Sequence, residues 1–175
     1  KVLTRDFLLN ADCKTAFGAI EESLLWSAEQ RAASLAATLA CRPDDGSVWI
    51  FGYGSLMWNP ALEYRESCTG TLPGWHRAFC LRLTAGRGSA TQPGRMLALK
   101  EGGRTTGVAY RLPDDTLEEE LTLLWKREMI TGCYLPTWCK LDLDDGRTVN
   151  ALVFIMDPRH PLFEADTSAQ VIAPL

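Results

Sequence analysis

The sequence predicts an α+β protein with an antiparallel or mixed β-sheet, and three observations lead to this fold class. After residue 48 the chain carries several short runs rich in β-branched and aromatic residues. Two connectors, Glu101–Arg104 and Asp144–Arg147, have the composition of hairpin turns. One helical pattern, from about Asp114 to Met129, interrupts the strands. Strands joined by hairpins are neighbours in a sheet, and such a sheet can curl into a barrel.

The predicted strands share an apolar character and are bounded by turn-forming residues. The first is short and apolar throughout, as in a buried strand. In chain order the strands are Val48–Phe51, Trp75–Leu83, Arg95–Lys100, Thr106–Leu112, Thr137–Leu143 and Val149–Met156.

The segment before these strands predicts a helical extension. Apolar residues recur at helical spacing over residues 12–41, and either Asp12 or Thr15 can cap the segment. Pro43, followed by two aspartates and a glycine, ends it. We therefore expect an N-terminal helical extension over residues 1–46 and one domain over residues 47–175.

Composition excludes several classes of protein. The 175 residues are 46% hydrophobic and 23% charged, with a formal net charge of −4, so neither nucleic acid nor an anionic membrane is an expected partner. No apolar run is long enough to span a bilayer, and Lys1–Asn10 lacks the apolar stretch of a secretory signal. The six cysteines form no CxxC pair, which predicts reduced thiols, no metal site and a cytoplasmic location.

A glycine loop follows the first predicted strand. In Phe51-Gly52-Tyr53-Gly54-Ser55-Leu56 the glycines allow a sharp turn and close approach to a ligand. Successive backbone N–H groups there can bind a carboxylate or another oxyanion. The loop lacks the lysine of a Walker motif and the third glycine of a dinucleotide-binding motif. It predicts either a small-anion site or a tight turn.

Glu128 is the candidate acid/base. Leu117, Leu121 and Leu124 mark the apolar face of the predicted helix, and the next step of four reaches Glu128. A carboxyl group on this face, in the last turn, has its pKa raised by desolvation and by the helix dipole. A raised pKa suits a general acid/base near neutral pH, although an ion pair with Arg127 would lower it. In the first turn Thr116 and Glu119 fit a capping box, and Glu118, Glu119 and Glu120 are expected to face mostly solvent.

Other polar residues are weaker candidates. Arg82, Arg87 and Arg95 flank a loop over residues 86–94, which predicts either a carboxylate site or solvated arginines. His76 is expected to be structural. No Ser/His/Asp arrangement stands out, and no cysteine has a histidine near it in sequence.

Four motifs together resemble the ChaC family of γ-glutamylcyclotransferases, and their order and spacing agree over roughly residues 48–157. The helical extension also looks like that of the bacterial members. The motifs are Val48–Trp58 (VWIFGYGSLMW), Gln92–Arg95 (QPGR), Gly107–Pro113 (GVAYRLP) and Trp125–Glu128 (WKRE).

The resemblance implies a compact β-barrel with flanking helices and no metal or organic cofactor. It implies that Glu128 is the catalytic residue and that the glycine loop binds the γ-glutamyl group, with Arg95 a weaker candidate for a substrate contact. The implied substrate-binding residues are Ile50, Phe51, Gly52, Tyr53, Gly54, Ser55, Leu56 and Arg95.

The implied activity is that of a carbon–nitrogen lyase that degrades glutathione to 5-oxoproline and Cys-Gly. The alternatives are a non-catalytic protein that binds γ-glutamyl ligands or regulates cation transport, and a cyclotransferase for other γ-glutamyl amides. Family members continue for some tens of residues past Leu175, so the resemblance also implies that the domain lacks its C-terminal helical part. The sequence predicts no oligomeric state.

Overall fold

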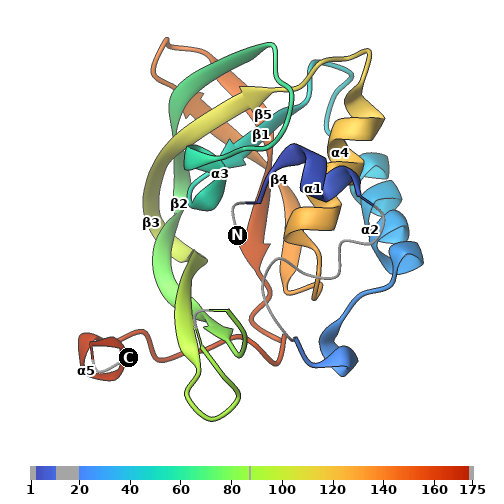
Figure 1. The fold of residues 1–175 in the computed structure, drawn as a ribbon. Helices are drawn as coiled ribbons and strands as arrows, with labels where there is room; N and C mark the ends of the chain where they lie inside the picture. The colour runs from blue at the N-terminus through green and yellow to red at the C-terminus, as the bar shows by residue number, and fades with distance from the viewer. Residues whose placement is uncertain (1–2, 11–19, 87, 174–175) are drawn as a thin grey trace.

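Five strands close into a barrel in the order β1-β3-β2-β4-β5 (Figure 1). The computed structural model describes residues 3–10, 20–86 and 88–173. Neighbouring strands are antiparallel except β1 and β5, which are parallel. The prediction of a mixed sheet curled into a barrel with flanking helices is confirmed. The strands are β1 (Trp49–Gly52), β2 (Glu66–Leu83), β3 (Gly94–Arg111), β4 (Tyr134–Leu143) and β5 (Thr148–Met156).

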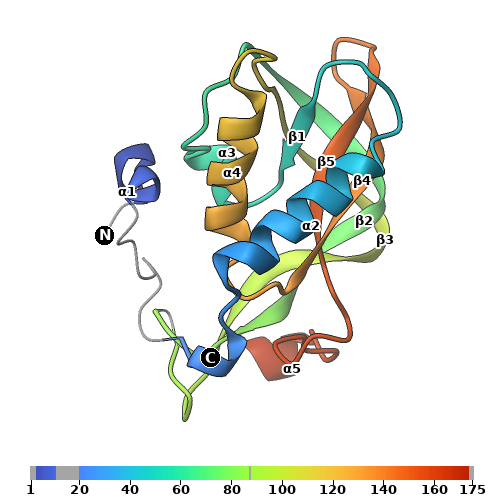
Figure 2. The same ribbon diagram turned by 90° about the vertical axis from the view of Figure 1, so that its right-hand side faces the viewer.

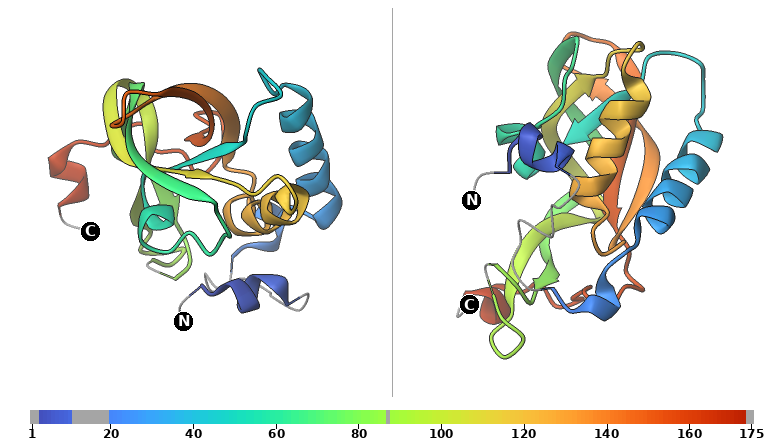
Figure 3. Two further views of the ribbon diagram at one scale, coloured as in Figure 1. Left: turned by 90° about the horizontal axis from the view of Figure 1, so that it is seen from above. Right: turned by 45° about the vertical axis from the view of Figure 1, so that its right-hand side comes forward.

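Helices cover one side of the barrel. Helices α2 and α4 lie together there, while the short α5 lies at the end of the molecule reached by the β2–β3 hairpin (Figures 2 and 3). No helix in the described ranges is long and apolar enough to cross a membrane. The helices are α1 (Arg5–Leu9), the 3₁₀ helix η1 (Glu22–Leu24), α2 (Ala28–Ala40), α3 (Ser55–Trp58), α4 (Leu117–Glu128) and α5 (Ala169–Ile172).

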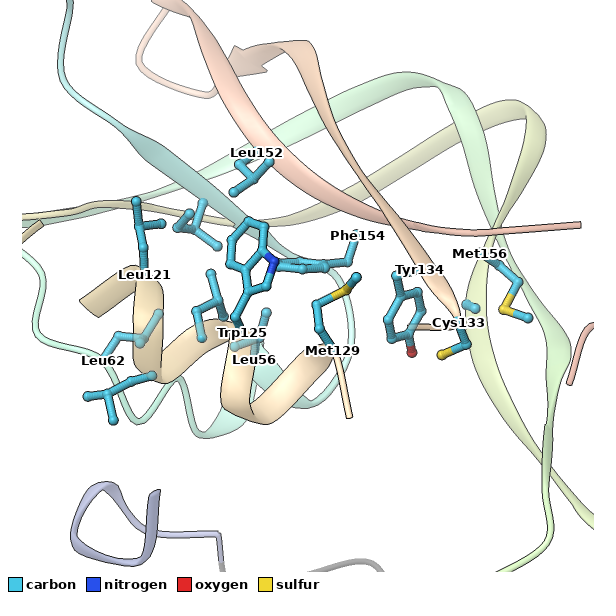
Figure 4. Packing of buried hydrophobic residues seen from close by; sticks show 14 of the residues in the cluster. Leu56, Leu62, Leu121, Trp125, Met129, Cys133, Tyr134, Leu152, Phe154 and Met156 are labelled. Carbon is cyan, nitrogen blue, oxygen red and sulfur yellow. The ribbon is translucent and has the colours of Figure 1, made fainter. Parts of the chain in front are cut away.

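A buried aromatic residue fixes α4 on the barrel. Trp125 is 1% exposed and meets the ring of Phe154 on β5 edge-on, with 5.3 Å between centroids (Figure 4). Its indole N–H donates to the hydroxyl of Ser34 on α2 at 3.2 Å. Leu121 and Leu124 are fully buried on the same helix. Burial of a side chain of this size stabilises the fold by about 2–3 kcal/mol, so the last turn of α4 is held firmly.

The N-terminal helix is shorter than predicted. Residues 12–19 lie outside the described part, and with them the predicted caps Asp12 and Thr15. Residues 20–27 are not α-helical, and α2 begins only at Ala28 because Ser27 and Gln30 form a capping box. The segment before it turns inward, where the Trp26 N–H donates to the carbonyl of Ile130 at 2.8 Å.

The predicted hairpin turn at Glu101–Arg104 is wrong. β3 runs through this segment, and β2 begins at Glu66, nine residues before the predicted strand. Gly102 and Gly103 have φ of 102° and 69° and form a bulge opposite Gly74, where the pairing with β2 changes register. Glycine supplies positive φ in a bulge as readily as in a turn. The turn predicted at Asp144–Arg147, between β4 and β5, is confirmed.

The first turn of α4 also differs from the prediction. The helix begins at Leu117, but Thr116 makes no capping hydrogen bond and its buried hydroxyl has no partner. Glu120, expected to face solvent, is fully buried. Its carboxylate accepts two hydrogen bonds from Arg5 on α1, at 2.6 and 2.7 Å, and one from the Glu63 N–H at 2.9 Å. This cluster joins α1 and the segment before β2 to α4.

β3 passes very close to the start of the glycine loop. A Cβ atom on Gly107 would lie 2.3 Å from the carbonyl oxygen of Gly52 and 2.7 Å from the ring of Phe51. A Cβ atom on Gly54, by contrast, would meet no atom within 4 Å. Only glycine therefore fits at position 107, whereas the space beside Gly54 is open.

We predict that Glu120→Ala lowers the free energy of unfolding by about 2–3 kcal/mol, because three hydrogen bonds to a buried carboxylate are lost. The cost stays at this level because the Arg5 side chain, 26% exposed, can be hydrated. Urea denaturation measures the change. Glu119→Ala, on the exposed side of the same helix, is the matched control and should shift stability by less than about 0.5 kcal/mol. Equal effects of the two substitutions would contradict the role of Glu120.

We also predict that Gly107→Ala destabilises the barrel by about 3 kcal/mol or more, because the added methyl group forces β1 and β3 apart. Gly54→Ala should cost no more than about 1 kcal/mol, since its methyl group points into open space. Thermal unfolding of the two variants tests this difference. A Gly107→Ala protein as stable as the parent chain would contradict the prediction, because it would show that β1 and β3 can move apart without loss of stability.

Candidate active site

Glu128 occupies the last position of α4, on the face that packs toward the barrel. Its side chain keeps 15% exposure, so the carboxyl group is largely desolvated. Burial raises its pKa, and the neighbouring Arg127 guanidinium opposes this shift without cancelling it. Of the effects weighed for this residue, desolvation and the ion pair with Arg127 are both present, and desolvation is the larger. The pKa of Glu128 lies above that of an ordinary glutamate, as a general acid/base requires.

The glycine loop links β1 to α3 and faces the same region. Gly52 is needed for packing, because a Cβ atom there would lie 3.0 Å from Cβ of Leu56. Gly54 is the N-cap of α3 and has an open side. Tyr53 is buried, and its hydroxyl donates to the carbonyl of Phe154 at 2.6 Å. One glycine thus allows the tight turn, and the other leaves backbone accessible to a ligand.

Arg127 connects the loop to Glu128. Its Nε lies 2.8 Å from Oε1 of Glu128, and its Nη2 donates to Oγ of Ser55 at 3.1 Å. Its Nη1 donates to the carbonyl of Pro60 at 2.9 Å and also to that of Asn59. The two motifs, more than 70 residues apart in the chain, therefore meet through one guanidinium. Helix α4, anchored by Trp125, sets the position of both charges.

Arg77 on β2 supports the loop from the other side, and sequence reasoning did not identify it. Its Nε donates to the carbonyl of Tyr53 at 2.6 Å, and its Nη2 donates to the carbonyl of Thr106 on β3. Nη2 also lies 3.5 Å from the sulfur of Met57. No local signal distinguishes Arg77 from a surface arginine on a strand, because its role depends on the way the barrel closes.

Among the described residues, Tyr53, Cys133 and Tyr134 are ionisable groups that lie within electrostatic reach of Glu128, in addition to Arg127. Burial and the charge of Glu128 both raise the pKa of Tyr53 and Tyr134 well above the ordinary tyrosine value. Burial likewise raises the pKa of Cys133 to about 11. Cys133, just before β4, and Tyr134, its first residue, lie just beyond Met129 (Figure 4). At neutral pH all three groups are protonated, so the Cys133 thiol is a poor nucleophile.

Several predicted substrate-binding side chains lie inside the core, and one, Arg95, lies elsewhere. Ile50 and Phe51 are 0% exposed, so any effect of their side chains on a ligand is indirect. Arg95 lies opposite Arg82 near the start of β3, whereas Val108 of that strand pairs with Gly52. The Arg95 guanidinium is 3.3 Å from Glu164, which Arg82 also approaches at 3.9 Å. The structure brings Glu128 and Gly52–Leu56 together but not Arg95, whose substrate contact stays a prediction.

The remaining candidates have structural partners. His76 contacts the carbonyl of Gly102 at 3.0 Å, within the β3 bulge, and Arg87 lies outside the described residues. In residues 3–10, 20–86 and 88–173, no three His, Cys, Asp or Glu side chains gather closely enough to hold a metal ion. The five cysteines of these ranges are free thiols, and Cys13 lies outside them.

Comparison with known proteins identifies relatives over most of the chain. The glutathione-specific gamma-glutamylcyclotransferase of Escherichia coli K12 is 89% identical over 174 residues, which are 99% of this chain and 75% of that protein. Glutathione-specific gamma-glutamylcyclotransferase 1 of Rattus norvegicus is 36% identical over 135 residues. That match covers 74% of this chain and 60% of the rat protein. The chain thus spans between about three fifths and three quarters of the length of these relatives.

A solved structure shares the fold. The crystal structure of a yeast gamma-glutamyl cyclotransferase specific to glutathione superposes with a TM-score of 0.66 at 20% sequence identity, covering 73% of this chain and 77% of that one. The model of the family described as ChaC-like protein matches residues 48–175, from the residue before β1 to the last residue. The chain belongs to the ChaC family.

Proposed function

We propose that this protein is a γ-glutamylcyclotransferase that degrades glutathione to 5-oxoproline and Cys-Gly. The observation that carries the proposal is a desolvated glutamate joined through Arg127 to a glycine loop with an open side. The names of the Escherichia coli and rat relatives support the reaction and its substrate.

The reaction needs no nucleophile from the protein. The α-amine of the γ-glutamyl group attacks the γ-carbonyl carbon of the same residue and closes a five-membered lactam. The bond from that carbon to the cysteinyl nitrogen then breaks, and Cys-Gly leaves as an amine. Holding the substrate in a folded conformation contributes much of the rate, on the order of 7–11 kcal/mol in favourable intramolecular reactions.

Glu128 carries the proton between the two nitrogens. As a carboxylate it accepts a proton from the α-ammonium group, and as the acid it gives this proton to the departing cysteinyl amine. The attacking nitrogen loses its second proton to solvent as it becomes the lactam N–H. The raised pKa suits both steps, because it makes the carboxylate a stronger base and makes the protonated acid easier to form near neutral pH. Arg127 holds the carboxyl group through Oε1, 2.8 Å from its Nε.

The glycine loop binds the γ-glutamyl group. The first N–H groups of a helix have no acceptor within it, so those of Gly54, Ser55 and Leu56 are available to an oxyanion. The oxyanion is either the α-carboxylate of the substrate or the oxygen of the tetrahedral intermediate. Ile50, Phe51, Gly52 and Tyr53 shape this loop from behind.

Two further parts of the proposal concern organisation and location. Residues 47–175 form the cyclotransferase domain, and residues 1–46 form an extension whose helix α2 packs on α4. We place the protein in the cytoplasm, because free cysteines, including the exposed Cys41, are compatible with a reducing compartment.

We predict that Glu128→Gln retains the fold and lowers turnover of glutathione by about 100- to 10,000-fold, because glutamine cannot carry the proton. Mass spectrometry of 5-oxoproline and Cys-Gly gives the rate. Glu119→Gln, an exposed position of the same helix, is the matched control and should match the parent chain. Normal turnover in Glu128→Gln would remove this residue from the mechanism.

The same assay separates the competing functions. Free glutamate in place of 5-oxoproline would indicate hydrolysis instead of cyclisation. Thermal stabilisation by glutathione without any product would favour a γ-glutamyl-binding protein. Faster turnover of other γ-glutamyl amides would keep the reaction and change the substrate.

A further inference from the structure

Arg127 is the most heavily bonded side chain of the site, and the proposed mechanism gives it no step of its own. Its side chain is 4% exposed, although it lies beside the open loop. Each of its three nitrogens has a partner: Nε contacts Glu128, Nη2 the Ser55 hydroxyl, and Nη1 the carbonyls of Asn59 and Pro60. Glu128 is the only carboxylate paired with it in the described ranges. The bonds to α3 and its flanking loop all go to neutral oxygens.

These contacts depend on the shape of a guanidinium. Its donors are spread over a rigid planar fork, so one arginine can reach the helix, the Ser55 hydroxyl and the loop at once. A lysine at this position keeps the positive charge but presents one nitrogen, which cannot contact all of these groups. Arginine therefore supplies two separable properties here, a charge beside Glu128 and a fixed spacing between Glu128 and the loop.

We propose that Arg127 is a positioning residue of the cyclotransferase reaction, whose guanidinium fixes the carboxylate of Glu128 relative to Ser55 of the substrate-binding loop. The inference rests on the proposed function. The inference goes beyond the proposed function because it states that Arg127 sets the distance between Glu128 and the bound γ-glutamyl group. Arg127 touches neither the reacting nitrogens nor the carbonyl in this account and acts only through its two neighbours.

The charge of Arg127 has a separate effect that can be measured. In the part of the chain that the structure describes, the ionisable groups that interact electrostatically with Glu128 are Arg127 on α4, Tyr53 after β1, Cys133 just before β4 and Tyr134 at its start. Of these, only Arg127 is charged at neutral pH, and it lowers the pKa of Glu128. Removing this charge must therefore raise the pKa further, so the carboxylate form appears only at higher pH.

The experiment compares Arg127→Gln and Arg127→Lys with the parent chain in the glutathione assay across pH. Activity requires the carboxylate form, so kcat/KM rises as pH passes the pKa of Glu128. We expect Arg127→Gln to move this rise to higher pH by about one unit or more. Both variants should lower kcat by about 10- to 100-fold, because the carboxylate is displaced. In Arg127→Lys the rise should stay near its original pH. The substrate amine is the same in every assay, so differences between variants report on the protein.

Arg77→Gln is the matched control. Arg77 also supports the loop, but through the carbonyls of Tyr53 and Thr106 and without contacting Glu128. Loosening the loop in this way should change KM or kcat without moving the pH at which activity rises. A shift of similar size in Arg77→Gln would overturn the assignment, because it would show a general structural effect.

The outcomes separate this inference from the proposed function. A parent chain without 5-oxoproline production contradicts the function itself. An active parent chain, with normal kcat and an unmoved pH profile in Arg127→Gln, overturns only the role of Arg127. If Arg127→Gln does not fold, Arg127→Lys decides: a reduced kcat with an unmoved profile supports the inference, and a normal kcat refutes it.

Discussion

The contact between the buried Arg127 guanidinium and the Glu128 carboxylate is the interaction on which the site depends. The same guanidinium joins the end of α4 to the loop that follows β1 through the Ser55 hydroxyl, and its charge opposes the effect of burial on Glu128. Burial favours the neutral acid, whereas the guanidinium favours the carboxylate. The balance leaves a carboxyl group that can both accept and release a proton. A fully solvated glutamate would be too weak a base, and an isolated buried one would not ionise readily.

The barrel holds the helix that carries Arg127 and Glu128 in place beside the loop. Trp125 packs against Phe154 and so anchors the last turn of α4 to β5. On the other side, Gly107 lets β3 pass close to Gly52, and Arg77 binds the carbonyl of Tyr53. The loop and the helix are therefore supported by different strands of one closed sheet. A candidate site built on rigid elements in this way holds its groups at fixed positions relative to one another.

The sequence predicts the position of Glu128 on α4 better than it predicts the contacts that support the candidate site. Glu128 is found because a carboxylate interrupts an apolar face with regular spacing, which is local information. The pairing of Arg5 with Glu120 is not found, since the partners are 115 residues apart and each resembles a solvated residue. Gly102 and Gly103 mislead for another reason, because a diglycine serves a bulge and a turn equally well. Contacts that form only when the barrel closes cannot be predicted from a short window of sequence.

The central claim is that the Glu128 carboxyl holds its proton to higher pH than an ordinary glutamate. Direct titration of ¹³C-labelled glutamate carboxyl groups by nuclear magnetic resonance tests it, with a glutamate in a short unstructured peptide as the reference. The account predicts that the Glu128 resonance titrates at higher pH than the peptide glutamate, and that the Glu128→Gln spectrum lacks it. A Glu128 midpoint at or below that of the peptide would show that Arg127 outweighs burial, and would contradict the account.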